Sequence, residues 1–216
     1  MLQNDANACA LAEWQLGAGK GCRNMIFLTF GTGLGAGLIL NGELYSGTNG
    51  MAGEAGHIRL AEDGPVGYGK EGSFEGFCSG GGIAQLGQVM AEEALDREEI
   101  PSFCQSKGEL FKVNARTIAE AAEKGDPLAL KIYDIVADRL GQGLAILVDL
   151  LNPEKIVIGS IFLRQEKLLR PRMEKILNKE ALDQSLSVVE VVPAGLGEKL
   201  GDYAAVSVGL RAYQKK

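Results

Sequence analysis

Glycines gather in a few segments of this chain, and this clustering limits the fold more than any other feature of the sequence. The chain has 30 glycines among 216 residues, about twice the usual frequency of ~7%. They crowd into segments 31–37, 47–56, 64–82 and 195–201, with ordinary sequence between them. Because glycine has no Cβ, such clusters are typical of places where the backbone approaches a ligand or adopts positive φ angles.

The first glycine cluster lies between two short apolar runs of strand length. These runs are residues 25–30 and 36–40, and Asn41-Gly42 follows the second one. Asn-Gly is a strong hairpin-turn signal because both positions tolerate positive φ. With a third strand at 43–45, the sequence predicts three consecutive antiparallel strands and a glycine-rich loop between the first two.

Helical and strand patterns alternate along the rest of the chain. We predict helices at 6–17, 83–95, 116–123, 164–178 and 202–213, and strands at 155–158 and 188–192. Asp126-Pro127 predicts the start of a long helix, whose apolar residues step by three and four from Leu128 to Leu151. The order predicts an α/β fold with helices on both faces of a mixed five-stranded sheet, made of three antiparallel strands plus two helix-linked strands, and with a helical insertion.

Charge and hydropathy argue against two classes of partner. Lys and Arg number 22 against 28 Asp and Glu, for a net charge of -6, and the longest basic cluster is Lys215-Lys216. We therefore expect no nucleic-acid partner. Apolar runs fall short of the ~18 residues that cross a bilayer, and the start of the sequence lacks a signal-peptide pattern. Four cysteines without CxxC spacing fit free thiols, so we expect a cytoplasmic protein with no membrane partner.

The loop at 31–37 offers backbone N–H groups with little side-chain bulk. It is neither a Walker loop, since no Gly-Lys-Ser/Thr follows, nor a dinucleotide fingerprint, since a strand follows it. Successive N–H groups in such a turn can converge on a phosphate, and Thr32 adds a hydroxyl. From the loop alone, a glycine-rich hairpin without a ligand is an equally weighted alternative.

Carboxylates and the single histidine of the chain lie in further glycine-rich loops. His57 follows Glu54 by three residues, and Glu75 lies in the next such loop. Carboxylates accept hydrogen bonds from hydroxyls, and an imidazole offers one donor and one acceptor, so this set suits a polyhydroxylated ligand. The alternative, slightly favoured by the residues alone, is solvated loop charges and a structural histidine. Asp5, after Asn4, is either a helix cap or a proton acceptor in phosphoryl transfer.

Taken together, these motifs resemble the ROK family of repressors and sugar kinases. The resemblance rests on segments 4–8 (NDANA), 29–37 (TFGTGLGAG), 50–57 and 152–159 (NPEKIVIG), and it extends over essentially the whole chain. It implies an actin-like, ribonuclease-H-like lobe and ATP-dependent phosphorylation of a hexose, as in the family's glucokinases. It also implies a homodimer.

The resemblance assigns a role to each candidate residue. It makes Asp5 the general base that takes the proton from a sugar hydroxyl. The residues that match the family's sugar ligands are Asn4, Glu54, His57 and Glu75. Those that match its nucleotide site are Gly31, Thr32, Gly33 and Gly35 at the ATP phosphates, and Gly159 and Ser160 near the adenosine. Mg²⁺ arrives on the nucleotide, and catalysis then needs little beyond positioning and charge neutralisation.

One departure from the family pattern concerns zinc. The family's site is Cys-x-Cys-Gly-x-x-Gly-Cys with an upstream His, whereas Val66, Tyr68 and Ser73 stand at the three cysteine positions here. Neither Val nor Tyr replaces a thiolate in a tetrahedral site, so we predict no structural zinc and no other metal site. We expect the loop to be held instead by packing of Phe74, Phe77 and Tyr68.

A second departure concerns the start of the chain. The Asp-x-Gly-x-Thr phosphate loop of the family's kinases does not precede Asn4, so the chain resembles the C-terminal lobe alone. We expect a single lobe over 1–216, with strands and phosphate loop at 22–47, sugar loop and helical insertion at 48–126 and an adenosine-side part at 127–216. A lone lobe is expected to have weak or no activity. The alternatives are a non-catalytic sugar-sensing module, as in the family's repressors, and an inactive remnant that serves as an interaction domain.

Overall fold

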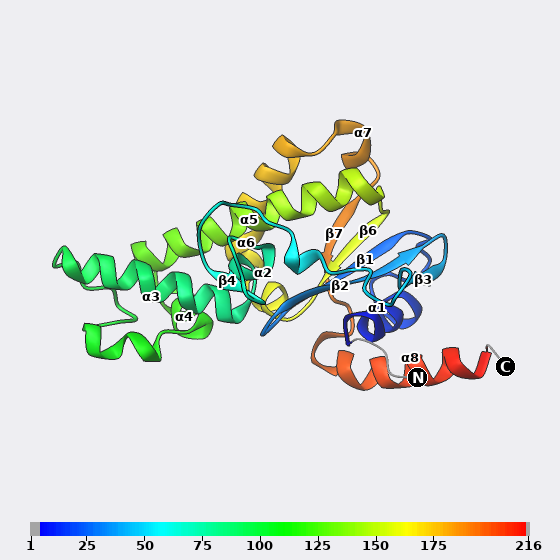
Figure 1. Cartoon of the computed structure of the whole chain (residues 1–216), viewed down its shortest axis with the longest axis horizontal. Helices are drawn as coiled ribbons and strands as arrows, with labels where there is room; N and C mark the ends of the chain where they lie inside the picture. The colour runs from blue at the N-terminus through cyan, green and yellow to red at the C-terminus, as the bar shows by residue number, and fades with distance from the viewer. Residues whose placement is uncertain (1–4, 215–216) are drawn as a thin grey trace. The chain divides into compact units, whose positions relative to one another are not determined.

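The computed structural model describes residues 5–214, with side chains at all of these except 198 and 210–214. Five of its strands form one sheet in the order β3-β2-β1-β6-β7 (Figure 1). β1 (Met25–Phe30) pairs antiparallel with β2 (Leu34–Leu40), which pairs antiparallel with β3 (Glu43–Tyr45). On its other side β1 runs parallel to β6 (Lys155–Ile158), and β6 runs parallel to β7 (Glu190–Pro193). This confirms the predicted mixed α/β sheet.

Helices and short turns make up most of the remaining described chain. The helices are α1 (Asp5–Leu16), α2 (Phe74–Phe77), α3 (Gly80–Asp96), α4 (Ala115–Glu123), α5 (Pro127–Leu151), α6 (Ile161–Glu180), α7 (Asp183–Leu186) and α8 (Leu200–Gln214). Short 3₁₀ turns are η1 (Ala55–His57), η2 (Lys107–Lys112) and η3 (Gly197–Lys199), and a small ribbon consists of β4 (Val66–Gly67) and β5 (Lys70–Glu71). Within residues 5–214, no helix has both the length and the apolar character needed to span a bilayer.

The structure shifts several predicted boundaries where glycines belong to regular elements. β2 begins at Leu34, two residues before the predicted start, because the Gly35 N–H donates to Thr29 Oγ1 of β1 at 2.9 Å. α3 begins at Gly80 instead of residue 83, because the Ser79 side chain caps it by accepting from the Gly82 N–H. β7 begins at Glu190, two residues later than predicted.

Contacts divide the chain into two compact units. Unit 1 consists of the chain up to Ala55, Ile146–Arg164 and the segment from Ala181 onward, and it contains the five-stranded sheet, α1 and α8. Unit 2 consists of Gly56–Ala145 and Gln165–Glu180, and it contains the β4–β5 ribbon, α2, α3 and α4. α5 and α6 contribute residues to both units.

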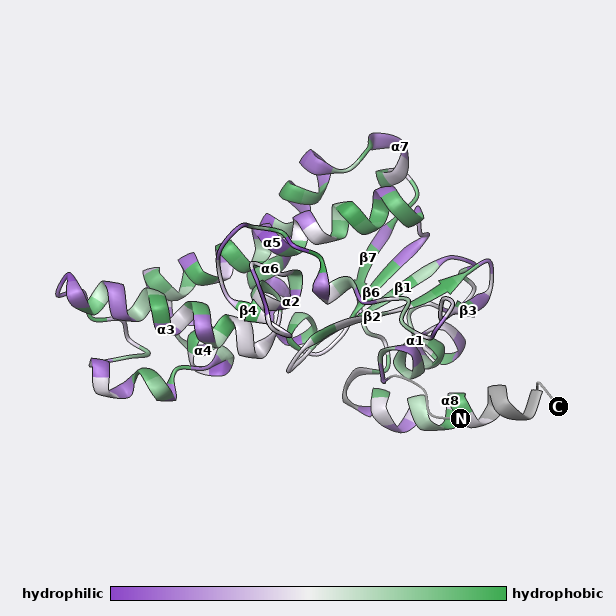
Figure 2. Ribbon diagram, in the orientation of Figure 1, coloured by the Kyte–Doolittle hydropathy of each residue, from purple (hydrophilic) through white to green (hydrophobic). Residues whose placement is uncertain are grey.

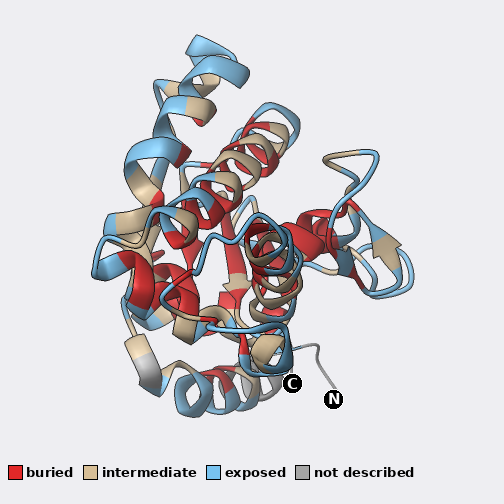
Figure 3. Cartoon of the chain, turned by 90° about the vertical axis from the view of Figure 1, so that its left-hand side faces the viewer, coloured by how far each residue is buried: buried red, intermediate tan, exposed pale blue. Residues whose placement is uncertain are grey.

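The core of unit 1 lies on both faces of its sheet. Met25 and Phe27 of β1 pack with Leu11 of α1 on one face, and α8 packs against α1 (Figure 1). Because side chains alternate along a strand, residues 26, 28 and 30 point to the opposite face, and they too are buried. Figures 2 and 3 show apolar and buried residues running along these strands. The predicted helical cover on both faces agrees with this burial.

α1 lies unusually close to the sheet at Gly37 of β2. A Cβ added at Gly37 would lie 2.5 Å from the Cβ of Ala10 and 2.5 Å from the carbonyl oxygen of Ala6. Neither contact is sterically allowed, so a side chain at this position would push α1 away from the sheet. The absence of a side chain therefore allows α1 to pack this close to β2.

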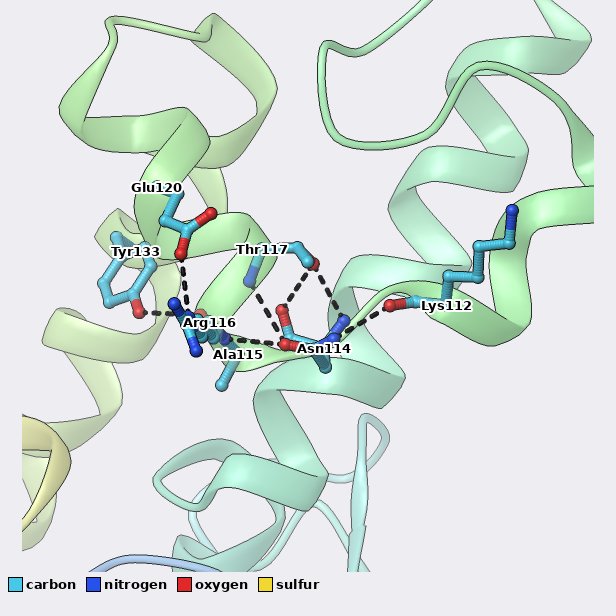
Figure 4. A network of polar contacts seen from close by, with 7 residues as sticks. All are labelled: Lys112, Asn114, Ala115, Arg116, Thr117, Glu120 and Tyr133. Atoms are coloured by element: carbon cyan, nitrogen blue, oxygen red, sulfur yellow. Dashed lines mark hydrogen bonds and ion pairs between the residues drawn. The ribbon is translucent and has the colours of Figure 1, made fainter.

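Helix caps organise unit 2. The Asp126 side chain accepts from the Ala129 N–H at 2.9 Å, which confirms the predicted start of α5 at Pro127. The predicted apolar stripe of α5 is buried, including Ile132 and Val136. Asn114 and Thr117 form a reciprocal capping box at the start of α4 (Figure 4). The Tyr133 hydroxyl of α5 donates to the carbonyl oxygen of Ala115, the first residue of α4.

Candidate functional site

Three parallel strands of unit 1 end side by side, and glycine-containing loops follow each of them. Leu28 of β1 pairs with Ile158 of β6, and Ile158 pairs with Pro193 of β7. Loops 31–33, 159–160 and 194–197 therefore leave the same edge of the sheet, which we call the carboxyl edge. In open α/β sheets, ligands bind outside the carboxyl ends of the parallel strands. The carboxyl edge is thus the candidate site of unit 1.

Some backbone N–H groups of the loop between β1 and β2 are paired within the loop, and others are free to donate. The Gly31 N–H donates to the Gly33 carbonyl at 3.1 Å, and the Gly35 N–H donates to Thr29 Oγ1. The N–H groups of Thr32 and Gly33 have no partner among residues 5–214. The Thr32 side chain is exposed. Among the predicted phosphate-binding residues, the free N–H donors are therefore those of Thr32 and Gly33, at the tip of the loop.

The second loop of the carboxyl edge holds a non-glycine residue in the left-handed region. Ser160 has φ of 53° and is exposed, a conformation that costs of order 1–3 kcal/mol and is typical of functional sites. The Gly159 N–H continues the ladder by donating to the Leu28 carbonyl at 3.0 Å. A Cβ added at Gly31 would lie 3.5 Å from Ser160 Oγ, so the structure brings the predicted phosphate loop and the predicted adenosine-side residues together.

Asp5 lies beside the same loop. It is the first residue of α1, it is exposed, and its Oδ1 accepts from the Ala6 N–H at 2.8 Å. The Cβ of Ala6 lies 3.6 Å from the position that a Cβ at Gly35 would occupy. The start of α1 is therefore adjacent to the predicted phosphate loop. Asn4, the predicted neighbour of Asp5 in sugar binding, lies outside the described residues.

Glu54 follows a segment that is docked onto the start of β2. The Ala36 N–H donates to the Gly53 carbonyl at 2.9 Å, and Gly53 has φ of 94°. A Cβ at Gly53 would collide with the Ala36 carbonyl oxygen at 2.2 Å, so only glycine fits there. This contact leaves the exposed Glu54 side chain on a fixed piece of backbone in unit 1.

His57 and Glu75 belong to unit 2, where their two loops are joined by backbone contacts. The Phe74 N–H donates to the Ile58 carbonyl at 2.8 Å, so the residue after His57 is bonded to the residue before Glu75. Glu75 lies in the first turn of α2, which Ser73 caps by accepting from the Gly76 N–H at 3.0 Å. The structure therefore brings together two of the predicted sugar ligands that are 18 positions apart in the numbering.

The donor set around His57 does not fit a tetrahedral zinc ion. Val66 lies in the β4–β5 ribbon, Tyr68 in its turn, and the Ser73 hydroxyl is used as a helix cap. Among residues 5–214, no three His, Cys, Asp or Glu side chains lie close enough to hold a metal ion. Phe74 and Phe77 are buried, as expected for packing that holds the loop. The expectation for Tyr68 is wrong. It is 90% exposed.

Tyr68 is exposed because it occupies the turn of the ribbon, with φ of 45°. Its ring meets the His57 ring edge-on, with centroids 6.3 Å apart and an interplanar angle of 77°. The Lys70 ammonium donates to the His57 carbonyl at 2.7 Å. The ribbon thus contacts His57 in two ways: Lys70 bonds to its backbone carbonyl, and the exposed Tyr68 ring meets its imidazole.

Two features of the site had no assignment from sequence. The loop 194–197 was visible only as a glycine cluster, and the parallel register of β6 and β7 is what places it at the carboxyl edge. Glu13 of α1 is fully buried, with 0% of its surface exposed, and binds this loop. Its pattern in the sequence is that of an ordinary helical glutamate.

Comparison with known proteins gives consistent matches over the chain. The sequence model of the ROK family matches residues 1–208. A glucokinase of Halalkalibacterium halodurans is 36% identical over 204 residues, which are 93% of this chain and 60% of that protein. An N-acetylglucosamine repressor of Escherichia coli O157:H7 is 33% identical over 208 residues, which are 94% of this chain and 48% of that protein.

A solved structure agrees with these sequence matches. It is a ROK family glucokinase from Streptomyces griseus in complex with glucose and AMPPNP, with a TM-score of 0.81 and 30% identity. The match covers 96% of this chain and 67% of that one. The chain thus spans about three fifths of the first curated glucokinase and about half of the repressor.

Proposed function

The chain belongs to the ROK family, and on that premise we propose that it carries the nucleotide-binding and catalytic residues of an ATP-dependent hexose kinase. The observation that carries the proposal is the meeting of three parts in unit 1. The tip of loop 31–35, the strained Ser160 and the start of α1 at Asp5 all lie at or beside the carboxyl edge.

We assign the nucleotide to the carboxyl edge. Gly31, Thr32, Gly33 and Gly35 shape the loop that takes the phosphates, with the free N–H groups of Thr32 and Gly33 as donors. Gly159 and Ser160 then lie on the adenosine side. Backbone donors aimed at transferring phosphate oxygens stabilise charge without having to reorganise. Mg²⁺ would arrive with ATP, whose phosphates are its preferred ligands. The solved relative that holds AMPPNP supports this assignment.

We assign the hexose to Asn4, Glu54, His57 and Glu75, and the proton transfer to Asp5. In the proposed step the sugar hydroxyl oxygen forms a bond to the γ-phosphorus while the bond from that phosphorus to the bridging oxygen of ADP breaks. The hydroxyl proton moves to the Asp5 carboxylate, and ADP leaves with the bond's electron pair. Asp5 is suited to this role because it is exposed and lies beside the phosphate loop. A cytoplasmic homodimer is the state that we propose for the protein.

Replacing Asp5 by Asn tests the catalytic assignment. When the chain is fused to the N-terminal lobe of a ROK glucokinase, Asp5→Asn should lower glucose-dependent ADP release by about 10²–10⁴-fold relative to the unsubstituted fusion, because a positioned general base contributes that much. Glucose binding, measured by calorimetry, should change little. Asp63→Asn, in an exposed loop, is the matched control and should leave turnover unchanged. Turnover of Asp5→Asn at the unsubstituted rate would remove Asp5 from the role of base.

A second candidate function is sugar sensing without catalysis. The 33% identity to an N-acetylglucosamine repressor over 94% of this chain favours it. A sensor would raise its Tm with N-acetylglucosamine or glucose, since a ligand that binds only the folded state stabilises that state, yet would release no ADP. Measured in the same fusion to an N-terminal lobe, sugar-dependent ADP release would decide for the kinase, and a Tm shift without turnover would decide for the sensor.

A further inference from the structure

Glu13 is a buried carboxylate, and both of its oxygens accept hydrogen bonds from backbone N–H groups. Its Oε2 accepts from the Ala18 N–H at 2.8 Å and from the Gly195 N–H at 3.1 Å, and its Oε1 accepts from the Leu196 N–H at 2.9 Å. Its exposed fraction is 0%, and no cationic side chain of the described chain pairs with it. Burying an unpaired carboxylate is costly unless strong hydrogen bonds compensate, so these three N–H bonds are what keep it there.

These bonds fix the loop that follows β7. Gly195 and Leu196 lie 182 and 183 residues beyond Glu13 in sequence, and they belong to the carboxyl edge. The preceding residue is also held, since the Ala194 N–H donates to the Ile158 carbonyl at 2.9 Å. The loop is therefore bound to β6 on one side and to α1 on the other.

The loop also packs closely against the segment that follows α1. A Cβ added at Gly195 would lie 2.9 Å from the Ala18 nitrogen, closer than side chains approach backbone atoms. Gly197, two residues on, has φ of 56°, in the left-handed region that favours glycine. The chain then enters η3 and α8, and α8 packs against α1. Glu13 is the polar contact that joins α1 to this turn of backbone.

Glu13 lies on the same helix as Asp5. They are eight positions apart, about 12 Å along an α-helix at ~1.5 Å per residue. A rigid helix that begins at the proposed base thus ends at the loop beside the proposed adenosine-side residues. A group that only filled the space would leave the Ala18, Gly195 and Leu196 N–H groups without these acceptors. Two carboxylate oxygens that accept from consecutive N–H groups instead define the loop's conformation.

We propose that Glu13 is a positioning residue for the nucleotide, holding loop 194–197 in the conformation that completes the binding site at the carboxyl edge. This inference rests on the proposed function and deepens it. Glu13 touches no substrate itself. Its effect is exerted through the backbone of Gly195 and Leu196.

The variant Glu13→Gln tests the inference at nearly constant volume. An amide has one acceptor oxygen, so it turns an NH₂ donor toward at least one of the three N–H groups. We expect amide exchange at 195–196, followed by mass spectrometry, to accelerate by about tenfold or more. The Kd for AMPPNP, measured by calorimetry, should rise about tenfold, while the Kd for glucose stays unchanged. Leu11→Ala, a buried change on the same helix with no hydrogen bond to the loop, is the matched control for lost stability.

The possible results distinguish a failure of the positioning role of Glu13 from a failure of the proposed nucleotide site. Faster loop exchange together with weaker AMPPNP binding in Glu13→Gln, but not in Leu11→Ala, supports the positioning role. Unchanged loop exchange, or faster exchange with AMPPNP binding intact, overturns it. An equal loss of AMPPNP binding in both variants also overturns it, because general destabilisation would then suffice. If the unsubstituted chain fails to bind AMPPNP, the proposed nucleotide site itself fails, and the role of Glu13 in it falls too.

Discussion

Charge at the start of α1 affects the cysteine next to it. Cys9 lies one turn after Asp5, and its pKa is raised from 9.0 to about 11, first by burial and then by the nearby carboxylates of Asp5 and Glu13. Both causes disfavour the thiolate. The Cys9 thiol should therefore be a poor nucleophile in the folded protein, because the thiolate is the reactive form.

Alkylation measures this effect. The thiolate is the reactive form, so a pKa two units above the ordinary value leaves about 100-fold less of it at pH 7–8. We expect iodoacetamide to label Cys9 about 100-fold more slowly in the folded protein than in urea. Cys22 should label faster than Cys9, because Lys155 opposes the effect of burial on its pKa. Peptide mass spectrometry gives both rates, and equal rates for Cys9 with and without urea would contradict the prediction.

At the scale of elements, single capping side chains decide where helices begin. Asp126 accepts from the Ala129 N–H at the start of α5 and from the Ser102 N–H at 2.7 Å. Desolvation by itself would raise the pKa of Asp126, but these backbone N–H groups outweigh it and lower the pKa. A carboxyl group whose pKa is lowered on folding contributes stability above its unfolded pKa, and that stability is lost as the pH falls through the folded pKa.

Replacing Asp126 should therefore have a pH-dependent cost. We expect Asp126→Ala to lower the free energy of unfolding by about 1–2 kcal/mol at pH 7, the usual range for an N-cap. The difference from the unsubstituted protein should shrink below pH ~4, where the unfolded-state carboxyl is protonated. Urea titrations across this pH range test it. Glu123→Ala, an exposed change in the preceding helix, should stay within ~0.5 kcal/mol, and a loss of equal size there would contradict the capping role.

The elements predicted from sequence are those with a strong local signal. β1 has the predicted bounds because an apolar run of strand length ends at a glycine, and α5 starts where a cap precedes a proline. The start of α3 was missed because three glycines suggest a loop, whereas Gly82 is required by its close approach to the Gly76 carbonyl. α2 and the β4–β5 ribbon were missed because two to four residues show no periodicity.

The candidate site likewise contains residues that the sequence singles out and residues that it does not. Loop 31–35 and Asp5 could be singled out because their motifs resemble those of the ROK family, whereas the residues alone left each of them with a structural alternative. The role of Glu13 could not, because its partners lie 182 and 183 residues away and are backbone groups of unremarkable residues. The joining of the His57 and Glu75 loops likewise depends on the bond between Phe74 and Ile58, which no local pattern predicts.

At the scale of the whole molecule, the proposed ligands divide between the two units. The residues assigned to the nucleotide all lie in unit 1, as do Asp5 and Glu54, whereas His57 and Glu75 lie in unit 2. Each ligand should therefore protect a different set of amides from exchange, because bound ligand suppresses the local opening that exchange requires. AMPPNP should protect segments 31–35, 159–160 and 194–197, all in unit 1.

Glucose should instead protect 53–59 and 73–77, which hold Glu54, His57 and Glu75. At saturating ligand we expect exchange in those segments to slow about tenfold or more. Glycerol at the same concentration is the control, since it offers hydroxyls without the ring that would reach several ligands at once. Protection by glucose confined to unit 1 would remove His57 and Glu75 from the sugar site. Protection of 73–77 by AMPPNP alone would do the same, because those residues would then respond to the nucleotide and not to the hexose.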